Sequence, residues 1–245
     1  MKYNFSILLK VWLKASIRDP GQFFRKRSIC ECSVCNYKGF FVTAKKKHFH
    51  PPFRCPNCES RPRDRQITLW FNEKNISLKE KKIIHFAPEW PLFRKLRYQP
   101  HYIGGDIIKR RNSNCILDIT SINFKDNYFD LLICNHVLEH VVQDTLAMKE
   151  CFRVMKKGSV GIFTVPISSN KETWTPPSNM PRQEVERICG WDHKRIYGQD
   201  FEKKLNDVGF KVKKYKPSLE KQKLHGLIDE NIYIAKKYIY SNKYI

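Results

Sequence analysis

The sequence predicts an α/β protein, a mostly parallel sheet of seven strands preceded by a small cysteine-rich module. From about Lys81 onward, short apolar runs alternate with helical segments, as they do in a buried parallel sheet. Upstream of that point, two Cys-x-x-Cys pairs lie in a turn-rich stretch. A chain of 245 residues is long enough for one α/β domain and one such module.

The N-terminal segment predicts a short amphipathic helix over residues 4–18, which ends at Asp19-Pro20-Gly21. Such a helix either packs on its own domain or lies on a membrane surface, and the sequence leaves both open. We assign residues 1–27 to it. We identify no clean export signal and no run of roughly 20 apolar residues that would span a bilayer.

Four cysteines form the predicted metal site. Cys32 and Cys35 make the first pair, Cys55 and Cys58 the second, and 19 residues separate the pairs. This spacing is typical of a zinc site with four thiolates, and a filled coordination sphere makes the Zn²⁺ structural. Three alternatives stay open: Cys30 replaces Cys32, His48 or His50 replaces a cysteine, or the cysteines are redox-active or disulfide-bonded. We assign residues 28–80 to this zinc ribbon and a connecting helix at 66–73.

The remaining cysteines bear on the compartment. Cys115, Cys134 and Cys151 lie in apolar segments, which suits buried thiols in a reducing environment. We therefore expect a cytoplasmic protein, at most peripheral to a membrane.

Residues 81–245 are predicted to form the sheet domain. Its helices are expected at 144–156, ended by the glycine of Lys156-Lys157-Gly158, and at 200–208. The predicted strands are 83–87, 102–106, 115–119, 130–135, 160–166, 210–215 and 231–237.

The net charge of +22 is unevenly distributed. Residues 1–80 hold 17 Lys and Arg against 6 Asp and Glu, whereas residues 81–200 hold 18 against 13 and residues 201–245 hold 11 against 5. The basic ends would suit nucleic acid, anionic lipid or a phosphorylated substrate. A solvated lysine-rich surface is the alternative.

Three segments resemble the class I S-adenosylmethionine-dependent methyltransferases. FDLLICNHVLEHVVQDTLAMKECFRVMKKGSVGIFTVP (129–166) is similar to that family's fourth strand, following helix and fifth strand, and LDITSINFKDNYFD (117–130) to the segment after its third strand. WDHKRIYGQDFEKKLNDVGF (191–210) and the HFAPE motif resemble a subgroup with an N-terminal zinc ribbon. The resemblance implies a Rossmann-like sheet with its last strand antiparallel, and S-adenosylmethionine as cofactor.

The cofactor residues are expected just after the strands, because open parallel sheets bind ligands beyond the carboxyl ends of their strands. Asp106 would accept the ribose hydroxyls, with Ile107 beside it. Asp118 would accept from the adenine amino group while Ile119 packs on the ring. Asn135 and His136 would lie beside the sulfonium. Each aspartate is alternatively an ordinary turn carboxylate.

The first motif departs from the family. HFAPEW contains no glycine, where the family's loop is glycine-rich to let the backbone approach the cofactor. S-adenosylmethionine has no pyrophosphate, so a phosphate-binding glycine loop is not required. We expect His85, Phe86, Ala87 and Glu89 to contact the cofactor, with Glu89 beside its ammonium or sulfonium.

The acceptor side is expected in the segment 167–196 and just after it. His193 is the predicted general base and Tyr197 a predicted acceptor contact, since a histidine takes up a proton near neutral pH. Both alternatively hold the hydrogen bonds of this segment. Glu139 and His140 either cap the following helix or take part in catalysis.

Three functions follow from these patterns. The first is methyl transfer by in-line displacement to a small-molecule or glycan acceptor. The second is methylation of RNA or another polyanion, with Arg61, Arg63 and Arg65 on its phosphates. The third is a non-catalytic binding module that kept the fold.

Overall fold

The computed structural model describes residues 5–24, 28–42 and 54–238. The chain forms two compact units. The first unit consists of the chain up to Ser77 together with residues 89–96 and 216–230, and the second holds the remainder. The boundaries predicted after residues 27 and 80 stay predictions.

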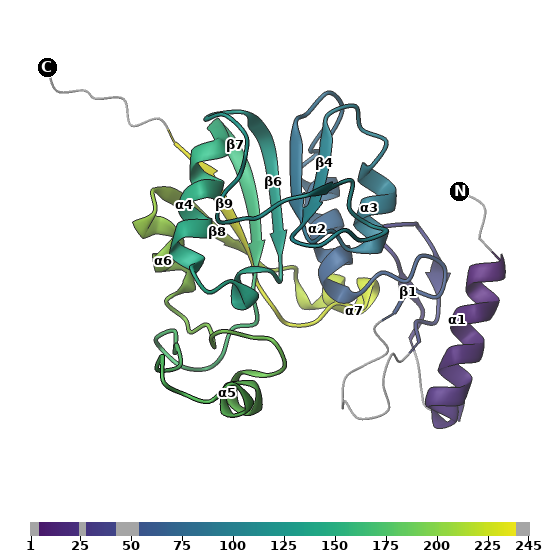
Figure 1. The fold of residues 1–245 in the computed structure, drawn as a ribbon. Coiled ribbons are helices and arrows are strands. Elements are labelled where there is room, and N and C mark those ends of the chain that lie inside the picture. Colours follow the sequence, from purple (N-terminus) through teal and green to yellow (C-terminus); the bar gives the residue numbers. More distant parts are fainter. Residues whose placement is uncertain (1–4, 25–27, 43–53, 239–245) are drawn as a thin grey trace, which may run out of the picture. The chain divides into compact units, whose positions relative to one another are not determined.

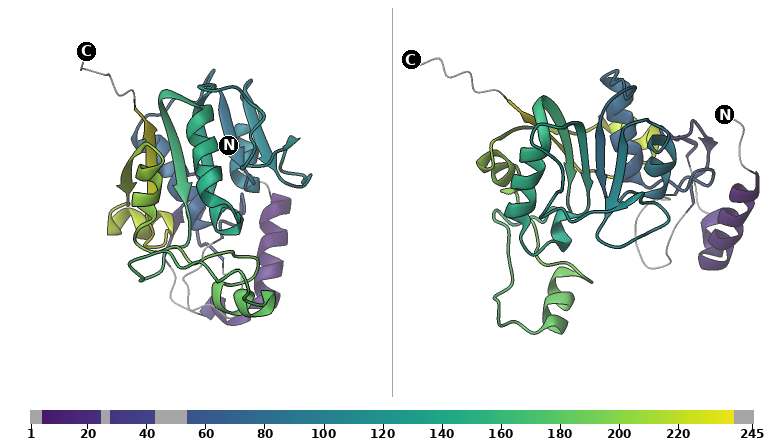
Figure 2. Two further views of the ribbon diagram at one scale, coloured as in Figure 1. Left: turned by 60° about the vertical axis from the view of Figure 1, so that its left-hand side comes forward. Right: turned by 45° about the horizontal axis from the view of Figure 1, so that its top comes forward.

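The second unit is built on a seven-stranded sheet with the order β5-β4-β3-β6-β7-β9-β8 (Figures 1 and 2). The strands are β3 (Ile83–Phe86), β4 (Tyr102–Asp106), β5 (Cys115–Ile116), β6 (Phe129–Asn135), β7 (Met155–Thr164), β8 (Phe210–Tyr215) and β9 (Ile232–Lys237). The first five pair in parallel, and β9 runs antiparallel to both β7 and β8. The predicted Rossmann-like sheet with an antiparallel last strand is confirmed.

The central strands are buried on both faces, which explains their continuous apolar sequences. All four residues of β3 are buried, and in β6 only Asp130 is partly exposed. The core of this unit gathers side chains from the strands, α4 (Asp144–Val154) and α6 (Phe201–Asp207). Figure 1 shows both helices beside the β7–β9–β8 half of the sheet.

The helix predicted over 144–156 is two residues shorter, and the strand after it begins five residues earlier than predicted. Helix α4 ends at Val154 and β7 starts at Met155. Met155 pairs with Phe129 and Val160 with Leu131, so the residues between them form a bulge. Gly158 lies in this bulge with φ at 79°, a conformation that glycine adopts without strain. Gly158 therefore allows the bulge in β7 and does not end α4.

The third strand is also shorter than predicted. It ends at Ile116, and Asp118 instead forms an isolated bridge with Ser121. Leu117 and Ile119 are buried in the core on either side of the exposed Asp118. The apolar residues of 115–119 therefore continue into the core after β5 has ended.

Helix α5 (Arg182–Cys189) lies within the long segment between β7 and α6, and the sequence pattern did not predict it. It has no buried residue, and Figures 1 and 2 show it on a loop that extends away from the sheet. The segment is fixed near its ends by bridges between Ile167 and Tyr197 and between Trp174 and Ile196.

The first unit contains the cysteine module and short helices. Its elements are α1 (Phe5–Arg18), the 3-10 helix η1 (Pro20–Phe24), β1 (Cys30–Glu31), β2 (Lys38–Gly39), α2 (Pro62–Glu73), α3 (Trp90–Leu96) and α7 (Leu219–His225). The helix predicted at 66–73 begins one turn earlier, at Pro62. Proline is tolerated there because backbone N–H groups in the first turn of a helix have no helical partner. Helices α3 and α7 were not predicted.

Arg65 holds the centre of the first unit together. Its side chain is fully buried and donates to the carbonyl oxygens of Ser60 (2.6 Å), His225 (2.8 Å) and Gly226 (2.5 Å). The guanidinium also lies 4.4 Å from the ring centroid of Phe41. Arg65 therefore ties α7 to the second cysteine pair, and it is not available to bind phosphate.

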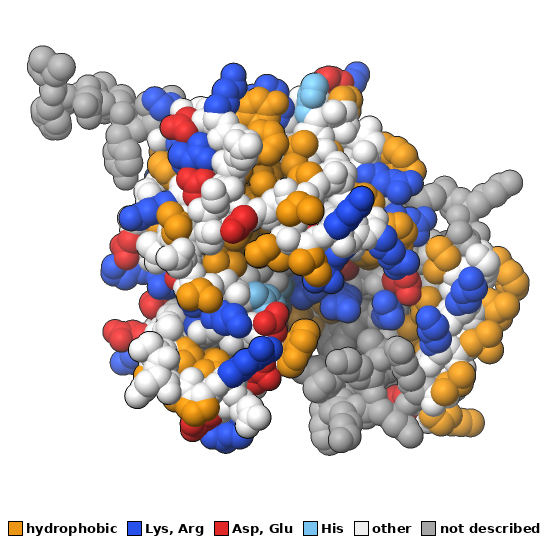
Figure 3. Space-filling view, in the orientation of Figure 1, with side chains coloured by type: hydrophobic (Ala, Val, Ile, Leu, Met, Phe, Trp, Pro, Cys, Tyr) orange, Lys and Arg blue, Asp and Glu red, His pale blue; other side chains and the backbone are white. Residues whose placement is uncertain are grey.

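Helix α1 confirms the predicted amphipathic helix, and it exposes a row of apolar side chains. Phe5, Leu9, Leu13 and Ile17, spaced four residues apart, are between 49% and 80% exposed, and Figure 3 shows apolar and basic side chains side by side over this helix. Within the described residues, the helices are too short or too polar to cross a bilayer.

A buried carboxyl group makes the first unit sensitive to pH. Asp64 is 1% exposed; it accepts from the backbone N–H of Arg61 at 2.8 Å, and its Oδ1 has no partner among the described residues. Burial, aided by the charge of Glu89, raises the pKa of Asp64 to about 7. Folding is thus opposed when this carboxyl is ionised.

We expect the free energy of unfolding to fall between about pH 4 and pH 7, by at most about 1.4 kcal/mol per pH unit from this group. The folded state keeps the proton over this range and the unfolded state does not. Asp64→Asn should flatten that slope, measured by urea unfolding at pH 5 and pH 8. Asp207→Asn, at an exposed carboxylate, is the control. Equal slopes in the wild type and Asp64→Asn would contradict the assignment.

Candidate functional site

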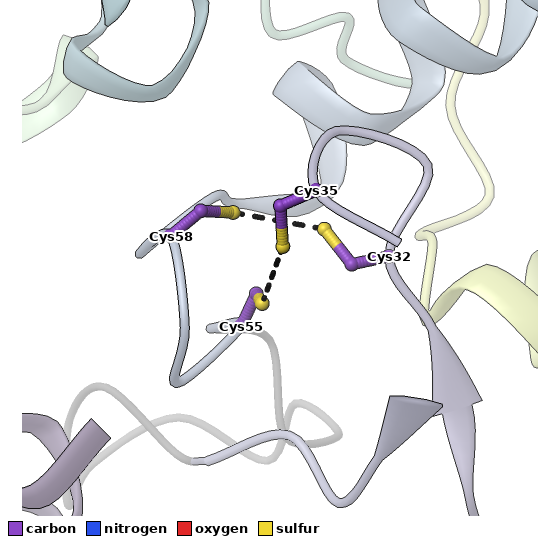
Figure 4. Close-up of side chains that lie close together, drawn as sticks. All are labelled: Cys32, Cys35, Cys55 and Cys58. Carbon is purple, nitrogen blue, oxygen red and sulfur yellow. Dashed lines mark hydrogen bonds between the residues drawn. The ribbon is translucent and has the colours of Figure 1, made fainter. Parts of the chain in front are cut away.

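The four predicted metal ligands lie together in the first unit (Figure 4). The Cys32 and Cys58 sulfurs are 3.7 Å apart, and so are those of Cys35 and Cys55. Tetrahedral Zn²⁺ with Zn–S bonds of about 2.3 Å places its sulfurs about 3.8 Å apart. The described residues contain no disulfide. The arrangement therefore fits a four-thiolate zinc site.

Polar groups surround these sulfurs. The Ser60 hydroxyl lies 3.2 Å from the sulfurs of Cys32 and Cys58, and the Asn57 amide donates to Cys35 Sγ at 3.4 Å. The buried Arg65 guanidinium faces the same thiols, and their charge offsets part of its burial cost. Such hydrogen bonds and charge stabilise bound thiolates.

One alternative ligand, Cys30, lies within the described residues. Cys30 Sγ lies apart from the cluster and contacts the carbonyl oxygens of Ser28 and Lys223, both at 3.7 Å. Cys32, not Cys30, completes the group of four. His48 and His50 lie outside the described residues.

In the second unit, the polar candidates follow β3, β4 and β6, whose parallel pairing aligns their carboxyl ends. His85 is fully buried in β3, and its Nδ1 lies 3.1 Å from the Tyr102 hydroxyl. Phe86 belongs to the hydrophobic core. These two predicted cofactor residues are thus buried inside the sheet, next to the edge where the loops begin.

Ala87 takes the conformation that a glycine would favour. Its φ is 43°, in the left-handed region, and its N–H donates to the carbonyl of Gly105 at 2.7 Å. A residue with a Cβ adopts this conformation at a cost of roughly 1–2 kcal/mol. The loop therefore turns sharply after β3 although its sequence contains no glycine.

Glu89 belongs to the first unit, where its carboxylate lies 3.5 Å from the Arg63 guanidinium. Its predicted contact with the cofactor stays a prediction.

Asp106 ends β4 with a carboxylate that is 7% exposed. The Arg110 guanidinium contacts it at 2.8 Å, and the N–H of Ile108 lies 3.4 Å from its other oxygen. Arg110 is 54% exposed, so its side chain can turn to solvent and free the carboxylate for a ligand. Ile107, the next residue, is 68% exposed and presents apolar surface beside the acid.

Asp118 is exposed, and its Oδ1 accepts from the N–H (2.8 Å) and hydroxyl (2.7 Å) of Thr120. This is the turn geometry foreseen as the alternative to adenine binding. Ile119 is buried in the core. Binding of adenine by this pair stays a prediction.

Asn135 ends β6, and His136 follows it. Asn135 is buried and accepts a hydrogen bond from the hydroxyl of Thr164 on β7. His136 has φ at 55° and donates its N–H to the Thr164 carbonyl at 3.0 Å. Its ring nitrogen lies 3.1 Å from the Glu139 carboxylate. The turn thus directs His136 toward the short 3-10 helix η2 (Leu138–His140).

Tyr197 is fully buried, and its hydroxyl donates to the Asp144 carboxylate at 2.8 Å. Burial raises the pKa of Tyr197, and the nearby negative charge raises it further. These contacts match the alternative of a residue that holds the 167–196 segment. Contact with an acceptor stays a prediction for this side chain.

His193 lies beside a histidine that is distant in sequence. The His140 and His193 rings are nearly perpendicular, with centroids 4.8 Å apart. Burial lowers the pKa of His193, opposed by the charge of Glu139. One ligand atom each from Glu139, His140 and His193 falls within 4.8 Å of the others. From the sequence alone, only the part of this cluster within the His-x-x-Glu-His run 136–140 could have been found, because His193 is distant in the chain.

A buried ion pair holds the chain around His193 against the chain around Glu139 and His140. Arg195 contacts the Asp144 carboxylate and donates to the carbonyls of Val141 (2.9 Å) and Val142 (2.6 Å). The N–H of Lys194 donates to the Glu139 carbonyl at 2.7 Å. Residues 194 and 195 are thereby fixed against the η2–α4 connection, which places His193 over Glu139.

Residues 106–163 match the methyltransferase domain family. A tRNA U34 carboxymethyltransferase of Sulfurovum sp. (strain NBC37-1) is 29% identical over 83 residues, which make up 34% of this chain and 26% of that relative. The chain thus spans about a quarter of the length of the curated relative that it matches.

Two solved structures align with the chain. The [4+2]-cyclase SpnF aligns with a TM-score of 0.53 and 12% identity over 80% of this chain and 90% of its own. A SAM-dependent methyltransferase from Archaeoglobus fulgidus aligns with a TM-score of 0.48 and 15% identity over 70% and 93% of the two chains. At these identities the likeness concerns the fold, because one fold hosts many reactions.

The left-handed conformation of Ala87 is testable by substitution. Ala87→Gly should raise the free energy of unfolding by about 0.5 kcal/mol, since relief of the strain exceeds the entropy that glycine loses on folding. Ala87→Val should lower it by at least about 1 kcal/mol. Urea unfolding measures both, with Ala147→Gly inside α4 as the control that must destabilise. Destabilisation by Ala87→Gly would contradict the strain.

Proposed function

Because the chain carries a class I S-adenosylmethionine-dependent methyltransferase domain, we propose that it transfers a methyl group from this cofactor to a hydroxyl of a small-molecule or glycan acceptor. The observation that carries the proposal is the edge of the sheet within the matched residues 106–163, where Asp106 and Asn135 end parallel strands and His136 follows the second of them. Ligands of open parallel sheets bind at this edge.

The donor is assigned to Asp106 and its neighbours. The Asp106 carboxylate accepts both ribose hydroxyls once Arg110 turns away, and the exposed Ile107 covers one face of the adenine. Asn135 and His136 lie at the end of β6 next in the sheet to β3, and we assign them to the methionine end. In-line displacement at the methyl group then depends mainly on positioning.

The acceptor is assigned to the space beside the histidine cluster. Figure 3 shows histidine side chains reaching the surface between the sheet and the segment that carries α5. Helix α5, with no buried residue, is free to adjust over a bound molecule. A hydroxyl acceptor must lose a proton during transfer, and a cluster of imidazole and carboxylate groups suits that need. His193, the base predicted from the sequence, is one member of this cluster.

An RNA acceptor is the second candidate. The matched relative is named a tRNA U34 carboxymethyltransferase, and the charge of +22 favours a polyanion. Of the three arginines predicted to hold phosphates, Arg65 is buried and Arg63 lies near Glu89, which leaves Arg61 exposed. An electrophoretic shift of tRNA that weakens steeply with salt would favour this candidate.

Two further proposals concern contact with a membrane and the cellular compartment. Peripheral membrane contact through residues 4–18 is supported by the exposed apolar row of α1. A cytoplasmic location is supported by the nine cysteines, all free of disulfides.

Calorimetric titration with S-adenosylhomocysteine tests the donor site. We expect saturable binding by the wild type and a loss of 10-fold or more in affinity in Asp106→Ala, because hydrogen bonds to a charged group contribute about 1.5–3 kcal/mol. Asp118→Ala should weaken binding as well. Asp207→Ala on α6 is the control that should bind unchanged. If the folded wild type does not bind S-adenosylhomocysteine, the proposal of a methyltransferase fails and the non-catalytic binding module becomes the favoured function.

We also propose that Cys32, Cys35, Cys55 and Cys58 hold one structural Zn²⁺. Elemental analysis of purified protein should find one tightly held zinc per chain. Cys55→Ser should lose it and unfold at lower urea concentration, since the metal stabilises the folded module. Cys189→Ser, at a cysteine outside the cluster, should retain it. Full zinc content in Cys55→Ser would rule out this ligand set.

A further inference from the structure

The cluster beside the predicted donor site has the composition of a metal centre different from the cysteine site. It offers one carboxylate and two imidazoles, from Glu139, His140 and His193. Nitrogen and oxygen ligands of this kind favour divalent cations from Mn²⁺ to Zn²⁺. Three protein ligands leave coordination positions open, as in catalytic centres.

Glu139 supplies the independent indication of a ligand. Its carboxylate is 1% exposed, and Oε2 has no hydrogen-bond partner among the described residues. A buried carboxylate oxygen without a partner is costly unless a cation compensates it. Arg195 and Lys194, the cations that follow His193 in the chain, pair with other carboxylates: Arg195 with Asp144, and Lys194 Nζ 3.6 Å from Asp192.

His140 is oriented as metal-binding histidines usually are. His140 Nδ1 lies 3.1 Å from the Asp192 carbonyl, so this nitrogen donates and Nε2 keeps its lone pair. His136 contacts the Glu139 carboxylate at 3.1 Å and steadies it. Ligand atoms around a cation with bonds of about 2.1 Å lie roughly 3–4 Å apart, so the present separations of at most 4.8 Å need only a small contraction.

We infer that Glu139, His140 and His193 bind a divalent cation, and that this cation holds the acceptor hydroxyl for methylation. The inference rests on the proposed function and adds a bound cation to its acceptor site. It replaces the role of free base for His193 with that of a ligand.

The reaction balances without any further reactant. The cation binds the acceptor oxygen and lowers the pKa of its hydroxyl, whose proton leaves to solvent. The oxygen forms a bond to the methyl carbon as the carbon–sulfur bond breaks, and its electrons remain on sulfur. The products are the methyl ether and S-adenosylhomocysteine.

Mn²⁺ is the probe, because a hard cation does not displace zinc from four thiolates. Zinc-loaded full-length protein is titrated with Mn²⁺, and electron paramagnetic resonance follows the loss of the free-ion signal. We expect one site per chain, with affinity at least 10-fold lower in Glu139→Gln and in His193→Ala. His101→Gln, at an exposed histidine outside the cluster, should bind as the wild type does.

Absence of Mn²⁺ binding by the wild type, or equal binding by the wild type and Glu139→Gln, would overturn the inference. His193→Ala guards against misfolding of the variant at the buried Glu139, since His193 is only partly buried. Titration with S-adenosylhomocysteine separates the two proposals. Mn²⁺ binding without cofactor binding would refute the methyltransferase while leaving the cation site in place.

Discussion

Parallel pairing of β3 with β4 on one side and β6 on the other is the constraint on which the candidate site depends. It aligns the carboxyl ends of three strands, so Ala87, Asp106 and Asn135 all begin loops at one edge. These strands are largely buried on both faces, so their polar groups reach solvent mainly in the loops that follow them. The predicted donor residues therefore lie at the ends of these strands and in the loops that follow them.

The buried pair of Asp144 and Arg195 extends this edge to a distant part of the chain. Asp144 begins α4, and Arg195 follows the long segment after β7. Separating them would leave a buried charge without its partner, at a cost of several kcal/mol. This pair and the carbonyls of Val141 and Val142 hold the end of the long segment that follows β7. His193 reaches Glu139 for this reason.

The sequence was informative where local patterns determine structure. Apolar runs predicted all seven strands, and the spacing of the cysteines predicted a cluster that the folded chain brings together. Helix α5 was not predicted, because it buries no residue and so leaves no apolar pattern. Helix α7 was not predicted either, although Ser218 before it and Gly226 after it are typical capping residues. The bulge at Gly158 and the joining of His140 to His193 across 52 intervening residues depend on tertiary contacts, which no local pattern encodes.

The two clusters of ligands differ in the way their chemistry requires. Four thiolates around one position leave no place for a substrate, and the hydrogen bonds of Ser60 and Asn57 and the charge of Arg65 make that arrangement rigid. The cluster at Glu139 has three ligands of two kinds, one of them on a segment that carries the exposed α5. A site that must admit and release an acceptor needs an open position and one adjustable side. The closed cluster stabilises the fold, and the open one is placed where the proposed reaction would occur.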